Sequence, residues 1–186
     1  MALHTQVAPD DCIEQYEQAA GERQEGGFLL LATGSALGVE MMALSVEMVL
    51  KAAYFRFIGY AVTRRIEMAD LRDAERDIQS LGVSQLSQGF HNLEFWAEGL
   101  AALHKHGLPV RSYTSHGTVR SYALVAAQPM NGTDELELQQ RAARLATNWA
   151  IGDRYKSLEP HASKQDLEDV FDDAMAIIHF YDQGRF

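Results

Sequence analysis

The spacing of apolar residues along the chain predicts an almost entirely helical protein. In several stretches apolar residues recur every three or four positions, which places them on one face of an α-helix. The strongest series predicts a helix over about residues 35–60 and consists of Met41, Leu44, Met48, Ala52 and Phe55. Further apolar residues continue round this helix, so we expect it to be the buried central helix of the fold.

Shorter helices are expected on both sides of the central one. A polar stretch over 10–24, followed by Gly26-Gly27, predicts a short peripheral helix that ends at the two glycines. Residues 70–81 have the pattern of a short charged helix. An amphipathic helix then begins near Leu93 and ends near Gly107, where basic residues before the glycine and a proline beyond it are a strong stop signal.

Two more helices are expected toward the C-terminus. Thr133 is a good N-cap for a helix that continues to about residue 152, and Ser163 for one that continues to about residue 181. The last helix is expected to bury its apolar face and to turn three acids toward water: Asp169, Asp172 and Asp173. The predicted fold class is all-α, a four- to five-helix up-and-down bundle with short accessory helices.

The length of 186 residues suits one domain with extensions. We expect an N-terminal extension over 1–34 and a helical domain over 35–183, with an insertion at about 111–132. Within that insertion the pattern is ambiguous between a short helix and strands. The single cysteine, Cys12, excludes an internal disulfide and disfavours a structural zinc site.

The charge balance restricts the partners of the chain. It has 16 basic and 26 acidic side chains, a net charge of −10, which disfavours broad binding to DNA. The N-terminus lacks the charged and apolar segments of a signal peptide, and the longest uncharged run, over 26–39, is too short to span a bilayer. We therefore expect a soluble, cytoplasmic protein that does not bind membranes.

Searches for common catalytic motifs find no P-loop, GxGxxG, GxSxG or HExxH pattern. His104, His106 and His116 lie close in sequence, but helix positions two apart face different directions. No carboxylate or cysteine ligand pattern accompanies these histidines. No metal and no cofactor is therefore expected.

Polar residues in apolar surroundings are the first candidates for a site. Glu47 and Lys51 lie on the central helix in the favourable i, i+4 order. We expect an ion pair at the edge of the core, and the alternative is a polar lining of a groove between helices. His91 precedes a helix and is expected to bond the loop backbone, whereas the alternative is an anion received at that helix N-terminus.

The loop over 149–161 contains both Arg154 and His161. Arginine is permanently charged and grips phosphate through two parallel hydrogen bonds, whereas histidine exchanges a proton near neutral pH. Cleavage of a phosphodiester by its own 2′-hydroxyl needs these two functions and no metal. The alternative is that Arg154 pairs with a nearby carboxylate and that His161 is merely exposed.

Four segments in this order resemble the HEPN domains, small helical nucleotide-binding domains of higher eukaryotes and prokaryotes. The segments are Glu47-x-x-x-Lys51-Ala52 with Gly59 beyond it, His91-Asn92-Leu93, Trp149 with Arg154-Tyr155, and the final helix over 166–181. The resemblance extends over about 35–181. It implies a helical module that binds a nucleotide, RNA or a protein partner through a cleft containing Glu47, Lys51, His91, Arg154 and Tyr155.

Many HEPN domains are metal-independent ribonucleases with an Arg-x(4–6)-His motif, usually at a dimer interface. The resemblance therefore implies a homodimer and, as an alternative activity, a toxin or defence endoribonuclease. In that alternative Arg154 holds the phosphate and His161 transfers the proton. A further alternative is a plain interaction protein whose partner face is formed by Met41, Met42 and Met48, although we favour a place in the core for these residues.

Overall fold

The computed structural model describes residues 12–84, 91–107, 113–115, 118–120, 130–149 and 164–185. Within these ranges the chain forms six α-helices and two short strands. The helices are α1 (Ile13–Ala32), α2 (Ala36–Phe57), α3 (Met68–Ser80), α4 (Leu93–His106), α5 (Gly132–Asn148) and α6 (Lys164–Asp182), and the strands are β1 (Tyr113–Ser115) and β2 (Thr118–Arg120). The predicted all-α fold class is confirmed for the helical bundle. The resemblance of this bundle to HEPN domains stays a prediction.

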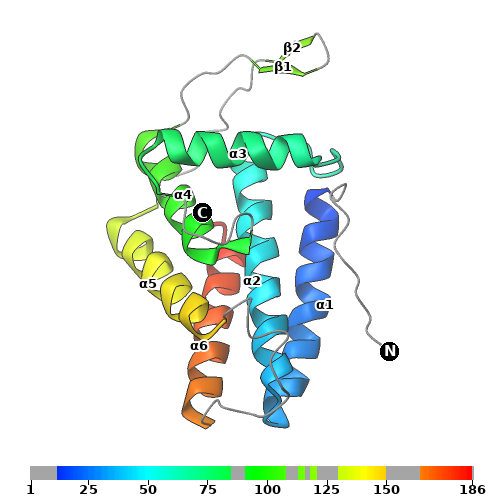
Figure 1. Ribbon diagram of the computed structural model, residues 1–186, viewed down its shortest axis with the longest axis vertical. Helices are drawn as coiled ribbons and strands as arrows, with labels where there is room; N and C mark the ends of the chain where they lie inside the picture. The colour runs from blue at the N-terminus through cyan, green and yellow to red at the C-terminus, as the bar shows by residue number, and fades with distance from the viewer. Residues whose placement is uncertain are drawn as a thin grey trace.

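Helix α2 is the central helix, as its sequence predicts. Figure 1 shows it between α1 and α6, with α3 lying across one end of the bundle. Its buried side chains cover most of its circumference, because neighbours pack on it from several directions: α1, α4 and α6. Met42 and Met48 are 0% and 4% exposed, so the interpretation as core residues is confirmed for these two methionines, whereas Met41 is only half-buried.

Helix α1 is longer and less peripheral than its sequence predicts. It runs through Gly26 and Gly27 to Ala32, so the prediction of a short helix that ends at the two glycines is wrong. The reason is packing: a Cβ atom on Gly27 would lie 2.8 Å from the sulfur of Met42, so the missing side chain lets α1 and α2 approach closely. Tyr16 and Ala20 lie in the same core as α2.

The ends of two other helices show which capping predictions hold. Helix α4 ends at Gly107, which has a φ of 66°, as the glycine stop signal predicts. Helix α5, however, is capped by Asn131 and not by Thr133. The Asn131 side-chain oxygen accepts hydrogen bonds from the backbone nitrogens of Thr133 at 3.0 Å and Asp134 at 2.9 Å, so the true cap lies two residues earlier.

The insertion contains an antiparallel pair of strands. Strand β1 pairs with β2 so that Tyr113 lies opposite Arg120, Thr114 opposite Val119, and Ser115 opposite Thr118. Of the two patterns that the sequence allowed here, the described residues adopt the extended one. Figure 1 shows both strands beyond α3 and clear of the bundle.

The described helices differ from membrane-spanning helices in length or in apolar character. None of those within the described ranges is both long enough and apolar enough to cross a bilayer.

Candidate functional site

Three of the residues singled out in the sequence meet where α2 faces the start of α4. Glu47 and Lys51 are one turn apart on α2, and the Lys51 ammonium donates to Glu47 Oε1 at 2.5 Å. His91 immediately precedes the Asn92 cap of α4, and its Nδ1 lies 3.1 Å from both carboxylate oxygens of Glu47. One buried carboxylate therefore holds two basic side chains, one from α2 and one from the residue before the cap of α4.

The carboxylate of Glu47 is ionised although it is only 4% exposed. Burial alone would raise its pKa, but the neighbouring Lys51 charge and the hydrogen bond from His91 outweigh burial and lower the pKa from 4.5 to about 2. At neutral pH the side chain of Glu47 is therefore a hydrogen-bond acceptor only. The predicted Glu47–Lys51 ion pair at the edge of the core is confirmed.

The state of Glu47 determines which nitrogen of His91 carries a proton. Because an ionised carboxylate only accepts, Nδ1 of His91 must be the donor of the bond to Glu47. In the neutral ring Nε2 then has a free lone pair, and in the charged ring it is a second donor. The sequence led us to expect a bond from His91 to the loop backbone, whereas the contact found is with the Glu47 side chain.

His91 and Lys51 differ in their access to solvent. The His91 side chain is 52% exposed, whereas the Lys51 side chain is 8% exposed. The Lys51 ammonium also lies 5.6 Å from the centre of the Trp96 ring, in cation–π geometry. Lys51 therefore acts mainly as the counter-charge of Glu47, and His91 is the member of the group that a ligand reaches first.

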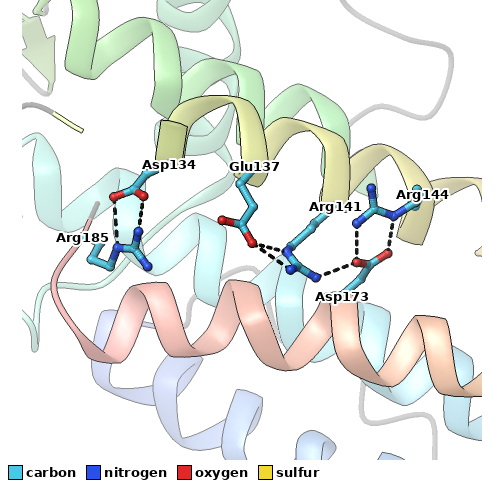
Figure 2. A network of polar contacts seen from close by, with 6 residues as sticks. All are labelled: Asp134, Glu137, Arg141, Arg144, Asp173 and Arg185. Carbon is cyan, nitrogen blue, oxygen red and sulfur yellow. Dashed lines mark hydrogen bonds and ion pairs between the residues drawn. The ribbon is translucent and has the colours of Figure 1, made fainter. Parts of the chain in front are cut away.

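A second polar group joins α5 to α6 and was not recognised in the sequence. Its six members, drawn in Figure 2, are Asp134, Glu137, Arg141, Arg144, Asp173 and Arg185. Asp173 on α6 accepts from Arg141 at 2.9 Å and from Arg144 at 2.6 Å. The prediction that Asp173 faces water is wrong, because Asp173 is only 4% exposed. Two guanidinium groups donate to its carboxylate in place of water.

Most arginines placed on or next to the helices are engaged with carboxylates. Ion pairs of this kind are formed by Arg56, Arg64, Arg76, Arg141, Arg144 and Arg185. A phosphate group would have to compete with these carboxylates for the same guanidinium donors. The arginine that the sequence proposes for phosphate, Arg154, lies outside the described residues, as do Tyr155 and His161.

Of the three histidines considered for metal binding, the structure describes His104 and His106. His104 packs its ring 4.8 Å from that of Phe57, centre to centre, and His116 lies outside the described residues. Among the residues that the structure describes, no group of three or more His, Cys, Asp or Glu side chains is arranged to hold a metal ion.

Comparison with known proteins identifies no relative of this chain. No family model matches the chain, and the searches of curated proteins and of solved structures find no similar protein. The candidate site therefore rests on its own geometry and on the motifs quoted above.

Proposed function

We propose that the chain is a HEPN-like helical module that binds a phosphate-bearing ligand, a nucleotide or RNA, beside His91. The observation that carries this proposal is the meeting of two motifs that lie 44 positions apart. Glu47 of the first motif accepts from His91 of the second, at 3.1 Å. Two motifs that form one binding site must lie next to each other in the fold, and this contact supports that arrangement.

The chemistry of the group fits a phosphate-bearing ligand. Glu47 fixes the orientation of the imidazole and keeps a proton on Nδ1. Nε2 of the half-exposed ring is then the atom that bonds a ligand, as a donor to a phosphate oxygen when the ring is charged. Arg154 is proposed from the sequence as the second phosphate ligand, with Tyr155 next to it.

Titration of the purified full chain with mononucleotides and short RNAs tests the proposal. We expect binding to weaken about tenfold or more in His91→Ala and in Arg154→Ala, because each removes a charge-assisted hydrogen bond. His179→Ala is the matched control, since His179 is an exposed histidine on α6. The absence of binding to every nucleotide and RNA tried would refute the proposal.

The endoribonuclease alternative has its own test. Incubation of RNA with the chain in the presence of a metal chelator should give cleavage that His161→Ala abolishes, if Arg154 and His161 act as a pair. Intact RNA after long incubation would contradict catalysis and leave the binding function standing. Light scattering of the same sample measures whether the expected homodimer forms.

A further inference from the structure

The contact between His91 and Glu47 also determines what the imidazole ring can do with a proton. Nδ1 of His91 donates to the carboxylate of Glu47, at 3.1 Å from each oxygen, so the lone pair of the neutral ring lies on Nε2. A carboxylate behind an imidazole keeps the ring in this orientation and stabilises the imidazolium that forms when Nε2 takes a proton. The pair therefore has the arrangement of a general base and not only that of a phosphate ligand.

The pair is held firmly on one side and is open to a substrate on the other. Glu47 is buried, and so is Asn92, whose side chain accepts from the backbone nitrogen of Phe95 at 3.1 Å and fixes the chain at the start of α4. The His91 side chain, by contrast, is half-exposed. Because Nδ1 faces the buried carboxylate, the open edge of the ring is the one that carries Nε2. A substrate can therefore reach Nε2 while the bond to Glu47 stays in place.

Lys51 sets the charge of the group. While the His91 ring is neutral, the charges of Glu47 and Lys51 cancel. When Nε2 takes a proton, the three side chains together carry one positive charge. Beside a phosphodiester this charge appears as negative charge builds up on the phosphoryl oxygens, so it stabilises the transition state more than the ground state. A phosphodiester with a hydroxyl group next to it, as in RNA, is the substrate class that uses both effects.

We propose that His91, oriented by Glu47, is the general base in the cleavage of RNA bound at this site. Nε2 takes the proton of a ribose 2′-hydroxyl, and the 2′-oxygen forms a bond to the adjacent phosphorus. The bond from phosphorus to the 5′-oxygen of the next nucleotide breaks, and water protonates that oxygen. The proton on His91 then returns to the hydroxide that remains. The products are a 2′,3′-cyclic phosphate and a 5′-hydroxyl.

The inference rests on the proposed function and deepens it, because RNA becomes a substrate and not only a ligand. It also differs from what the resemblance to HEPN domains implies, since that resemblance assigns the proton transfer to His161. The two assignments use different histidines, so single substitutions distinguish them.

Cleavage of a labelled RNA by the full chain, in the presence of a metal chelator, tests the proposal. The wild type should release 2′,3′-cyclic phosphate ends and leave a DNA strand of the same sequence intact. His91→Gln keeps a donor for Glu47 but cannot take up a proton, so kcat should fall about a hundredfold or more and KM should change less than about tenfold. His179→Gln is the matched control and should change kcat less than about twofold. His179 is exposed, and its ring contacts the neutral amide of Gln183 at 2.7 Å.

The part of Glu47 needs a variant that folds. Glu47→Gln alone leaves the buried Lys51 charge unpaired, so the test uses Glu47→Gln with Lys51→Met, and circular dichroism verifies the fold. In this double variant no carboxylate orients the His91 ring or stabilises the imidazolium. We expect kcat to fall about tenfold or more and KM to change less than about threefold. A kcat equal to that of the wild type would show that Glu47 takes no part in the proton transfer.

Binding and cleavage, measured on the same RNA, separate this inference from the proposed function. RNA that binds and stays intact overturns the general base and leaves the binding site at His91 standing. Cleavage by His91→Gln at the wild-type rate, together with its loss in His161→Ala, assigns the proton transfer to His161 instead. Products with 3′-hydroxyl and 5′-phosphate ends overturn the 2′-hydroxyl as the attacking group. RNA that is neither bound nor cleaved overturns the proposed function and this inference with it.

Discussion

A Cβ atom on Gly38 would lie 2.6 Å from the backbone nitrogen of Leu31, closer than such atoms approach in proteins. The first turn of α2 therefore packs against the last turns of α1 so tightly that a glycine is required at this position. Gly38→Ala should destabilise the protein by about 1–3 kcal/mol, because backbone atoms cannot move aside as a side chain can. Urea denaturation followed by circular dichroism measures the change.

Gly21→Ala is the matched control for that substitution. Gly21 lies within α1, and a Cβ atom there would meet no other atom within 4 Å. Since alanine favours helix more than glycine does, the variant should gain about 0.5–1 kcal/mol of stability. If both variants shift the urea midpoint in the same direction, the close approach of α1 and α2 is not what constrains Gly38.

The cap of α5 distinguishes two neighbouring residues that look equivalent in sequence. Asn131 accepts two backbone hydrogen bonds, and its side-chain nitrogen also donates to Asp134 at 2.8 Å. Asn131→Ala should therefore cost about 1 kcal/mol, whereas Thr133→Ala should cost only a few tenths. Thermal unfolding of the two variants compares them, and a larger loss for Thr133→Ala would show that Thr133 is the cap after all.

The parts of the fold that sequence predicts best are those with long apolar periodicity. Helix α2 is predictable because its apolar residues nearly surround it, and α4 because a regular face ends at Gly107. The length of helix α1 is not predictable, because Gly26-Gly27 looks like a local stop signal. The helix continues through the two glycines because they pack against α2. A glycine required for close packing and a glycine that ends a helix look alike in one sequence.

The same distinction between local and distant causes applies to the polar residues. The Glu47–Lys51 pair is predictable because both residues lie one turn apart on one helix. The contact with His91 depends on how α2 and α4 pack, which no local pattern encodes. Asp173 lies three residues after Val170 and four before Ile177, within the buried stripe of α6. This position is one that the helix buries, whereas the prediction of exposure to water followed the charge of Asp173 alone.

Asp173 should be important for the packing of α5 on α6. In Asp173→Asn two guanidinium groups, those of Arg141 and Arg144, lose a shared carboxylate (Figure 2). We expect a loss of about 2–3 kcal/mol, less than for a fully buried pair because both arginines still reach water. Chemical denaturation measures it. Glu168→Gln breaks the exposed Lys164–Glu168 pair and should cost less than about 0.5 kcal/mol, so an equal loss in both variants would contradict a special role for Asp173.

The low pKa of Glu47 makes a definite contribution to the pH dependence of stability. Burial opposes ionisation, but Lys51 and His91 lower the pKa from 4.5 in the unfolded chain to about 2 in the fold. The folded state therefore binds the proton less readily, so the stabilisation is complete above the unfolded value and is lost as the pH falls toward 2. The free energy involved is about 3 kcal/mol.

Glu47→Gln removes this titration and leaves the buried Lys51 charge without its carboxylate. The free energy of unfolding should therefore differ most between wild type and variant near neutral pH, by about 3 kcal/mol or more, and the difference should shrink as the pH approaches 3. Urea titrations of both proteins at a series of pH values measure it. Replacing the whole pair, as Glu47→Gln with Lys51→Met, should recover part of the loss, since no buried charge remains unpaired. If the difference in unfolding free energy between wild type and variant stays constant from neutral pH to pH 3, Lys51 and His91 do not lower the pKa of Glu47.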